Sequence, residues 1–416
     1  MNVDRREFLR VSAIAGSGVW MVSNGLAEEV LAQDEQLLKI QEAPTLRQRF
    51  LKEPIRIESV ELLKNAETFL VRIRSTDGVE SVTTPNSSKM RDFYPLFIHR
   101  VGKFFEGKNA CEIEDLLTQL YRNSSNYKLQ GLGFWVCQTA LEMGVLDLIG
   151  RTRGVSMGQL FADVRHTRIG VYRASGNRGN TPEQEIEVLR RFAEETGAKA
   201  LKFRLGGRMS RNADSLPGRT EKLIPLVRKV FGPDFTLYAD SNSSYDVQHA
   251  IRIGRLMEEH DYAFFEEPVP FDHLWETKQV ADALRIPVAG GEQEFSMRRF
   301  RWAIANRAVD VAQPDLHYFG GFIRSVKVAR MAEAAGLQCT PHMSGSGIGY
   351  VNVLHFASFT PNTGPHQEFK GETDIPCHSD TSSLKCVNGI VDCPTGPGMG
   401  VEIDPSFIKK SIPVSS

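Results

Sequence analysis

Polar residues recur at a regular spacing through the second half of this chain, each directly after a short apolar run. Six of them are Asp240, Glu266, Glu292, Asp315, His342 and Glu368, and the steps between them are 26, 26, 23, 27 and 26 residues. Steps of this length fit one strand followed by one helix. In a parallel barrel the carboxyl ends of all strands meet at one mouth, where the active sites of such barrels lie. We therefore expect these side chains to converge at one site.

The apolar runs themselves predict the fold. They are 169–172, 200–203, 236–239, 263–265, 287–289, 309–312 and 337–340, with an eighth at 367–369. Amphipathic stretches such as 182–196, 219–230 and 323–335 separate them and predict helices. Alternation of strands and helices predicts an α/β protein with a (β/α)8-type TIM barrel over 166–385. A doubly wound open sheet is the alternative, but no Gly-rich dinucleotide signature follows any of these runs.

The chain upstream of the barrel has a different pattern. Residues 55–83 predict a β-hairpin and a third short strand, since two apolar-rich runs are followed by the turn signal Asp77-Gly78. Residues 90–160 are expected to be mostly helical, and a helix over 129–150 is expected to end at Gly150 as its C-cap. We assign these elements to an N-terminal domain over 50–165.

Residues 1–32 carry the features of an export signal. Adjacent Arg5 and Arg6 precede Phe8-Leu9 and an apolar run over 11–27, a pattern that resembles the twin-arginine signal for folded proteins. We expect a periplasmic protein; the alternative is an ordinary amphipathic N-terminal helix. The run is too short and too interrupted by Gly and Ser for a stable membrane anchor. In an oxidising compartment a disulfide could form among Cys377, Cys386 and Cys393, with no pair assigned.

The charge balance excludes one class of partner. Lys and Arg number 50 and Asp and Glu number 51, which gives a formal net charge of -1. No basic field or basic helix is present to hold a nucleic-acid backbone. We therefore expect a small-molecule ligand and no nucleic acid.

Three of the strand-end residues predict a metal site. Asp240, Glu266 and Glu292 would repel one another at the mouth of a barrel, so they need a cation. Oxygen ligands suit a hard divalent ion, and we expect Mg²⁺. Taken singly, each carboxylate could instead cap the helix that follows its strand, and His342 could be a structural histidine.

Several short segments, in this order, carry a family resemblance. They are residues 140–150, Lys202-Phe203-Arg204, Tyr238-Ala239-Asp240-Ser241-Asn242, Phe265-Glu266-Glu267-Pro268, Gly290-Gly291-Glu292-Gln293, Gln313-Pro314-Asp315 with Gly320-Gly321, and Pro341-His342. Together they resemble the enolase superfamily and, within it, the mandelate racemase/muconate lactonizing enzyme group. The resemblance implies an α+β capping domain, made by the N-terminal segment and the tail at 386–416, that closes over the barrel mouth. It also implies Mg²⁺ on the three carboxylates and a homo-oligomer.

The resemblance further implies removal of a proton α to a substrate carboxylate. His342 is the implied base, with Asp315 behind its imidazole, and Glu368 is the implied partner of the substrate carboxylate. Where many members carry Lys-x-Lys on the second strand, this chain has Lys202-Phe203-Arg204. Arg204 is a poor base, so it is expected to clamp a substrate oxygen or to form a structural ion pair. Lys202 is expected to be a residual base or a stabilising positive charge.

A single clear base favours elimination. His342 could remove the α-proton and then protonate the departing hydroxide, which predicts a Mg²⁺-dependent acid-sugar dehydratase that forms a 2-keto-3-deoxy acid. The alternatives are a racemase or epimerase of an α-substituted carboxylate, and a non-catalytic acid-sugar binder. Three further residues are expected to contact substrate, namely Asn242, His317 and Glu294.

A covering loop is expected over 85–91, because the hairpin turn at 64–66 is too short to cover the site. Asn86, Lys89 or Arg91 would contact the substrate from this loop. The competing interpretation is a mobile, solvated loop without substrate contacts.

Overall fold

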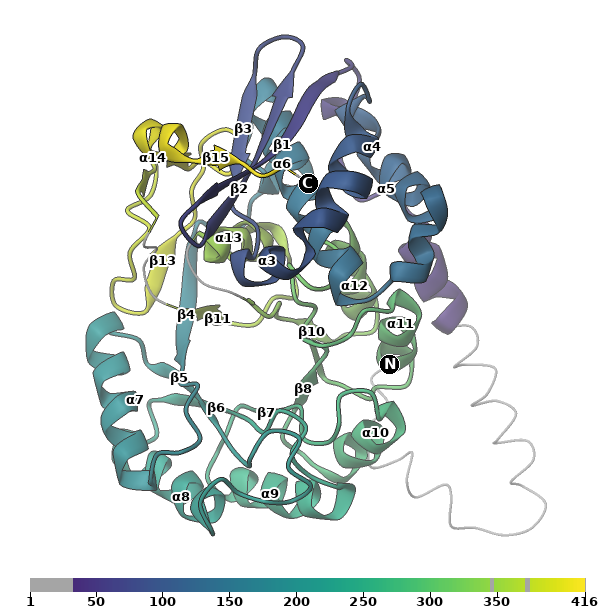
Figure 1. The fold of residues 1–416 in the computed structure, drawn as a ribbon. Helices are drawn as coiled ribbons and strands as arrows, with labels where there is room; N and C mark the ends of the chain where they lie inside the picture. Colours follow the sequence, from purple (N-terminus) through teal and green to yellow (C-terminus); the bar gives the residue numbers. More distant parts are fainter. Residues whose placement is uncertain (1–32, 345–347, 371–374, 416) are drawn as a thin grey trace, which may run out of the picture.

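Parallel strands form one curled sheet in the computed structural model, which describes residues 33–344, 348–370 and 375–415. They are β4 (Arg168–Ala174), β5 (Ala200–Arg204), β6 (Thr236–Asp240), β7 (Phe264–Glu266), β8 (Val288–Gly290), β9 (Val311–Ala312), β10 (Gln338–Cys339) and β11 (Gln367–Phe369). The order is β10-β9-β8-β7-β6-β5-β4-β11, so the last strand returns to the first (Figure 1). The predicted α/β fold of the TIM-barrel type is confirmed.

The register of this sheet sets the strand ends side by side. Arg204 pairs with Asp240, and Asp240 pairs in turn with Glu266. Because the ladders are parallel, residues at these ends lie at the same mouth of the barrel. The regular spacing in the sequence is therefore converted into spatial proximity by the strand register.

Helices follow each of the strands from β4 to β10 and cover the outside of the sheet. They are α7 (Pro182–Thr196), α8 (Arg219–Phe231), α9 (Val247–Glu259), α10 (Leu274–Ala283), α11 (Met297–Ala305), α12 (Phe322–Ala334) and α13 (Gly349–Phe359). α7 begins at Pro182 because Thr181 and Gln184 form a capping box around the first turn. The apolar faces of the helices, for example Leu189 and Leu223, are fully buried.

A second, antiparallel sheet and its helices lie at one end of the barrel (Figure 1). Its strands are β1 (Ile57–Asn65), β2 (Thr68–Ser75) and β3 (Glu80–Thr83), followed by α3 (Ser87–Leu96), α4 (Lys103–Phe105), α5 (Ile113–Arg122) and α6 (Leu132–Arg153). β12 (Cys377–His378) precedes the tail, which contributes β13 (Ile390–Asp392), β14 (Glu402–Ile403), α14 (Pro405–Lys410) and β15 (Ile412–Pro413). β15 pairs with β1 and β13 pairs with β4, so the tail joins both sheets.

The end of α6 differs from the prediction. The helix continues past Gly150 to Arg153, and Gly154 is the left-handed C-cap. A Cβ at Gly150 would lie 2.7 Å from the Cα of Gly398, so this glycine permits close packing of the tail against the helix. α6 is long and apolar enough to cross a membrane, but it is the buried central helix of this region.

The covering loop expected over 85–91 is the start of a helix. Asn86 is the N-cap of α3, and its side chain accepts the backbone N–H of Lys89. Asn is a favoured N-cap because its side-chain oxygen satisfies a free donor of the first helical turn. Arg91 forms an exposed ion pair with Glu67. The interpretation of this segment as a mobile loop was therefore wrong.

Two other predictions concern the export signal and the cysteines. The export signal over 1–32 lies outside them. All six cysteines are described, and all six are free thiols.

Candidate active site

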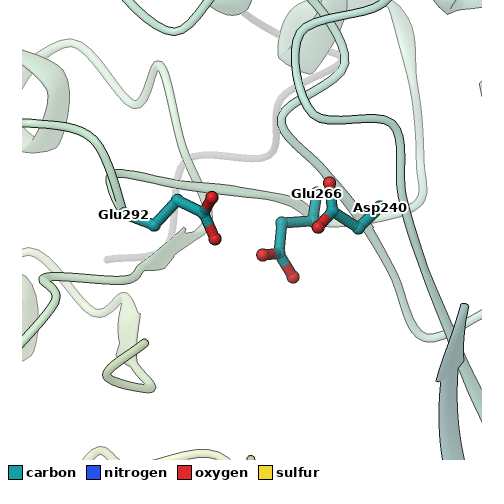
Figure 2. A group of neighbouring side chains, drawn as sticks. All are labelled: Asp240, Glu266 and Glu292. Atoms are coloured by element: carbon teal, nitrogen blue, oxygen red, sulfur yellow. The ribbon is translucent and has the colours of Figure 1, made fainter. Parts of the chain in front are cut away.

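Three buried carboxylates converge at the barrel mouth. Asp240 ends β6, Glu266 ends β7, and Glu292 lies two residues beyond β8. Each offers one oxygen atom, and these atoms all lie within 4.8 Å of one another (Figure 2). The regular spacing therefore predicted a real cluster.

The chemistry of this cluster fits a divalent cation. All donor atoms are carboxylate oxygens, the ligands that Mg²⁺ and Ca²⁺ prefer. Glu266 Oε1 is buried and has no hydrogen-bond partner among the described residues. Burial, and then the negative charges of Glu292 and Glu266, raise the pKa of the adjacent Glu267 well above its usual range. A cation between these carboxylates would compensate the excess negative charge.

The two cations of β5 are engaged by this cluster. Lys202 Nζ lies 2.7 Å from Glu266 Oε2, and both side chains are fully buried. Burial alone would lower the pKa of Lys202, but the charge of Glu266 raises it above its ordinary value. Arg204 forms an ion pair with Asp240. Lys202 is therefore held protonated, which fits a positive charge better than a base, and Arg204 has the structural ion pair that was one of its two predicted roles.

An imidazole–carboxylate pair lies beside the triad. His342 Nδ1 is 2.5 Å from Asp315 Oδ2. His342 Nε2 is 3.0 Å from Glu292 Oε2 and 3.6 Å from Glu368 Oε2, so the imidazole also reaches the end of β11. The structure thus brings the predicted base, its carboxylate and the predicted eighth-strand residue into one group.

The surrounding carboxylates control the proton affinity of His342. Burial disfavours the imidazolium, but the charges of Glu292 and Glu368 and the hydrogen bond to Asp315 raise the pKa of His342 to about 10. A cation on the triad would offset the charge of Glu292. The pKa would then move down toward neutrality, where an imidazole serves as a base.

Asn242 connects the triad to a group of guanidinium ions. Its backbone N–H donates to Asp240 Oδ1 at 2.6 Å, and its Nδ2 donates to Asp240 Oδ2 at 3.0 Å. Its Oδ1 accepts hydrogen bonds from Arg178 and, at 3.4 Å, from Arg208. Asn242 therefore lies at the mouth, as the substrate-contact prediction requires.

The other two predicted substrate contacts are placed differently. Glu294 accepts the backbone N–H groups of Phe295 and Ser296 and lies 3.0 Å from Arg299, so its carboxylate organises the turn before α11. His317 is buried beside the Asp315 carboxylate, which accepts its backbone N–H at 2.7 Å. The Nδ1 atom of His317 has no hydrogen-bond partner among the described residues.

Two further cations at the mouth escaped the sequence analysis. Lys370 follows β11, donates to Met343 O, and lies 3.7 Å from Glu368 Oε1. Arg178 lies in the segment after β4 and is half-buried. The regular spacing of polar residues at strand ends could have indicated both. Lys370 directly follows the last strand, and position 178 lies one 26-residue step before Arg204.

Comparison with known proteins assigns this architecture to a family. The family described as Enolase C-terminal domain-like matches residues 184–407. D-galactarolactone cycloisomerase from Agrobacterium fabrum is 30% identical over 312 residues, which cover 72% of this chain and 79% of that protein. Arabinonate dehydratase from Saccharolobus solfataricus is 26% identical over 341 residues, which cover 81% and 88%.

A solved structure agrees with this assignment. A mandelate racemase/muconate lactonizing protein from Paracoccus denitrificans, complexed with magnesium, superposes with a TM-score of 0.77 at 25% identity. The similarity covers 87% of this chain and 99% of that chain, so it includes the cap as well as the barrel.

Proposed function

Because this chain belongs to the enolase superfamily, in its mandelate racemase/muconate lactonizing enzyme group, we propose that it is a Mg²⁺-dependent acid-sugar dehydratase. The reaction would remove water from an acid sugar and give a 2-keto-3-deoxy acid. The names of two relatives, arabinonate dehydratase and D-galactonate dehydratase, support this reaction class. The observation that carries the proposal is the His342–Asp315 pair beside the triad, while both cations of β5 are held in ion pairs with carboxylates.

Asp240, Glu266 and Glu292 would hold the Mg²⁺ ion. When bound, the ion supplies positive charge that polarises a substrate carboxylate and makes the adjacent C–H bond more acidic. Lys202 and Arg204 balance part of the negative charge of the three carboxylates and orient Glu266 and Asp240.

His342 would carry the proton in both halves of the elimination. Its Nε2 takes the α-proton, while Asp315 accepts the Nδ1–H and holds the tautomer in which Nε2 is the free acceptor. The C–H electron pair forms the new carbon–carbon double bond, and the β-carbon–oxygen bond breaks. His342 then returns the proton to the departing hydroxide, which leaves as water, and the enol product rearranges to the 2-keto acid. One base is sufficient for this sequence.

Arg178 is a cation that forms no ion pair with the carboxylates of the triad. Among the described residues it has no carboxylate ion pair; it donates to Asn242 Oδ1 and, at 3.3 Å, to Leu205 O. Burial and the nearby charges of Arg204 and Arg208 lower the pKa of Arg178 to about 9. An anionic substrate would relieve this repulsion, so Arg178 is proposed to contact substrate oxygens beyond Asn242.

The test is a panel of acid sugars incubated with the purified protein and Mg²⁺, with 2-keto acid as the readout. We expect product from at least one acid sugar, and no product with EDTA or with His342→Asn. Exchange of the α-proton with D₂O, together with inversion and no keto acid, would support a racemase or epimerase instead. Tight binding without exchange or product would identify a non-catalytic acid-sugar binder.

A further inference from the structure

A chain of hydrogen bonds runs from the cap to the imidazole of the barrel. Asn86, at the start of α3, donates from Nδ2 to Ser344 Oγ at 3.2 Å. Ser344 Oγ donates to Asp315 Oδ1 at 2.9 Å, and Asp315 Oδ2 lies 2.5 Å from His342 Nδ1. Asn86 and Ser344 are both buried, with exposed fractions of 4% and 3%. This series of hydrogen bonds therefore connects the cap to the barrel through buried groups.

The orientation of the Asn86 amide is fixed by its neighbours. The backbone N–H of Lys89 and the hydroxyl of Ser88 both reach Asn86 Oδ1, at 3.2 and 2.9 Å. A backbone N–H can only donate, so the oxygen of the Asn86 amide must face α3 and its NH₂ group must face Ser344. Ser344 therefore accepts from Asn86. Its other neighbours are the Tyr318 hydroxyl, which can donate, and the Asp315 carboxylate, which accepts its proton at 2.9 Å.

The Ser344 hydroxyl is the third hydrogen-bond donor to Asp315 Oδ1. Oδ1 accepts the backbone N–H groups of His317 and Tyr318, both at 2.7 Å, as well as the Ser344 hydroxyl. With Oδ1 occupied in this way, Oδ2 is the oxygen that faces His342. Loss of the Ser344 bond would leave the carboxylate freer to rotate and the imidazole less well oriented.

We propose that Asn86 is a positioning residue for the catalytic imidazole, acting through Ser344 and Asp315. The N-cap of α3 orients the Asn86 amide, and the amide orients the Ser344 hydroxyl. The cap thereby adds to the alignment of the base that the backbone N–H groups of His317 and Tyr318 already provide. The kinetic part of this inference rests on the proposed function, in which His342 moves the proton; the structural part does not.

Asn86→Asp separates this role from helix capping. Asp is as good an N-cap as Asn, so α3 is retained, but the donor to Ser344 is replaced by an acceptor. The Ser344 proton then turns toward position 86 and away from Asp315. Ser88→Ala is the matched control, because it removes a bond to Asn86 Oδ1 and leaves the Nδ2 donor in place.

The first readout is the ¹H NMR spectrum of the full-length protein without substrate. The His342 Nδ1 proton, shared with Asp315 over 2.5 Å, should resonate far downfield and vanish in His342→Asn. We expect this resonance to shift or broaden in Asn86→Asp and in Ser344→Ala, and to stay unchanged in Ser88→Ala. An unchanged resonance in both of the first two variants would overturn the proposal.

The second readout is steady-state kinetics on the acid sugar that the panel identifies. We expect kcat to fall roughly tenfold in Asn86→Asp with little change in KM, since loss of a residue that orients a catalytic group through hydrogen bonds has an effect of this size. The double variant Asn86→Asp/Ser344→Ala should be no slower than Ser344→Ala, because Asn86 acts through Ser344. Additive losses would contradict the relay. A moved resonance with unchanged kcat would instead contradict the role of His342 in the proposed function.

Discussion

Lys202 is a fully buried ammonium ion that pairs with Glu266. Its replacement therefore measures how much this buried ion pair contributes to stability. Lys202→Met would remove the partner of Glu266 and leave that carboxylate buried without a counter-charge. Breaking a buried pair on one side costs about 3–5 kcal/mol of the free energy of unfolding. We expect a loss of this size in urea unfolding without added metal, and partial recovery with Mg²⁺, since Mg²⁺ on the triad would neutralise the same carboxylate.

Lys278→Met is the control for that substitution. Lys278 pairs with Asp282 one helical turn away on α10, where both side chains are partly exposed. Surface pairs of this kind contribute about 0.3–0.5 kcal/mol. Equal losses in the two variants would show that the Lys202–Glu266 pair contributes no more than an ordinary surface pair.

At the residue scale the sequence predicted the cluster but not its connections. The strand-end spacing was sufficient to bring Asp240, Glu266, Glu292 and His342 together, because each follows a strand of one parallel sheet. It could not indicate that Asn86 reaches Ser344, since that contact crosses 258 residues and depends on how the cap packs. For Glu294 the position after a strand suggested a substrate contact. In the structure its carboxylate instead accepts a backbone N–H of the turn that follows.

At the scale of elements, Glu142 joins the central cap helix to the barrel. Its carboxylate, on α6, accepts the backbone N–H of Ile323 at 2.9 Å, in the first turn of α12. Burial raises the pKa of Glu142 to about 8, and the hydrogen bonds from Ile323 and Phe322 only partly oppose this. Gln at this position can accept the same hydrogen bonds without carrying a charge.

Glu142→Gln should therefore stabilise the protein in a pH-dependent way. The folded-state pKa of about 8 lies above the ordinary value of 4.5, so the folded state binds more protons between these pH values. Stability of the parent then falls as pH rises through this window. We expect the variant to match the parent below the window and to exceed it by a few kcal/mol above it, on the order set by the pKa shift.

Urea unfolding at about pH 4 and about pH 9 would measure this difference. Glu187→Gln, on the exposed face of α7, is the control and should change stability by less than about 0.5 kcal/mol at both pH values. A Glu142→Gln variant that is less stable than the parent at the higher pH would mean that the ionised carboxylate is the better cap for α12.

The strands were predicted more accurately than the helices of the cap. Each barrel strand is a short apolar run followed by a polar residue, a local signal that survives without tertiary information. The ends of α6 and α3 depend on partners far away in the sequence. Gly150 suggested a helix end, yet it is required for contact with Gly398 of the tail. Pro85-Asn86-Ser87-Ser88 suggested a loop, yet it is an N-cap segment.

For the whole molecule, metal binding and folding should be linked. A ligand that binds only the folded state stabilises it by about 2.7 kcal/mol at a concentration of 100 times Kd. We expect Mg²⁺ to raise the urea midpoint of the parent protein in a saturable manner, and EDTA to reverse the effect. Asp240→Asn should abolish the response, whereas Asp282→Asn, on the surface of α10, should retain it. An equal response in both variants would mean that Mg²⁺ acts elsewhere than at the triad.

Strands from the last described residues pair with strands near the start of the cap and of the barrel. β15 pairs with β1, and both β11 and β13 pair with β4, so the fold joins segments that are far apart in the sequence. A chain of this topology suits a route that carries folded proteins, and its free cysteines impose no need for an oxidising compartment. We propose that Arg5 and Arg6 direct this folded export to the periplasm.

Arg5→Lys/Arg6→Lys in the full-length chain tests that proposal. After expression in a bacterial host, we expect the parent in the periplasmic fraction with a shortened N-terminus, and the variant in the cytoplasm at full length. The retained variant should still be stabilised by Mg²⁺, because the substitutions lie outside the barrel and the cap. Arg10→Lys is the control and should be exported normally. Equal periplasmic yields of parent and double variant would reject a twin-arginine route and favour the N-terminal amphipathic helix.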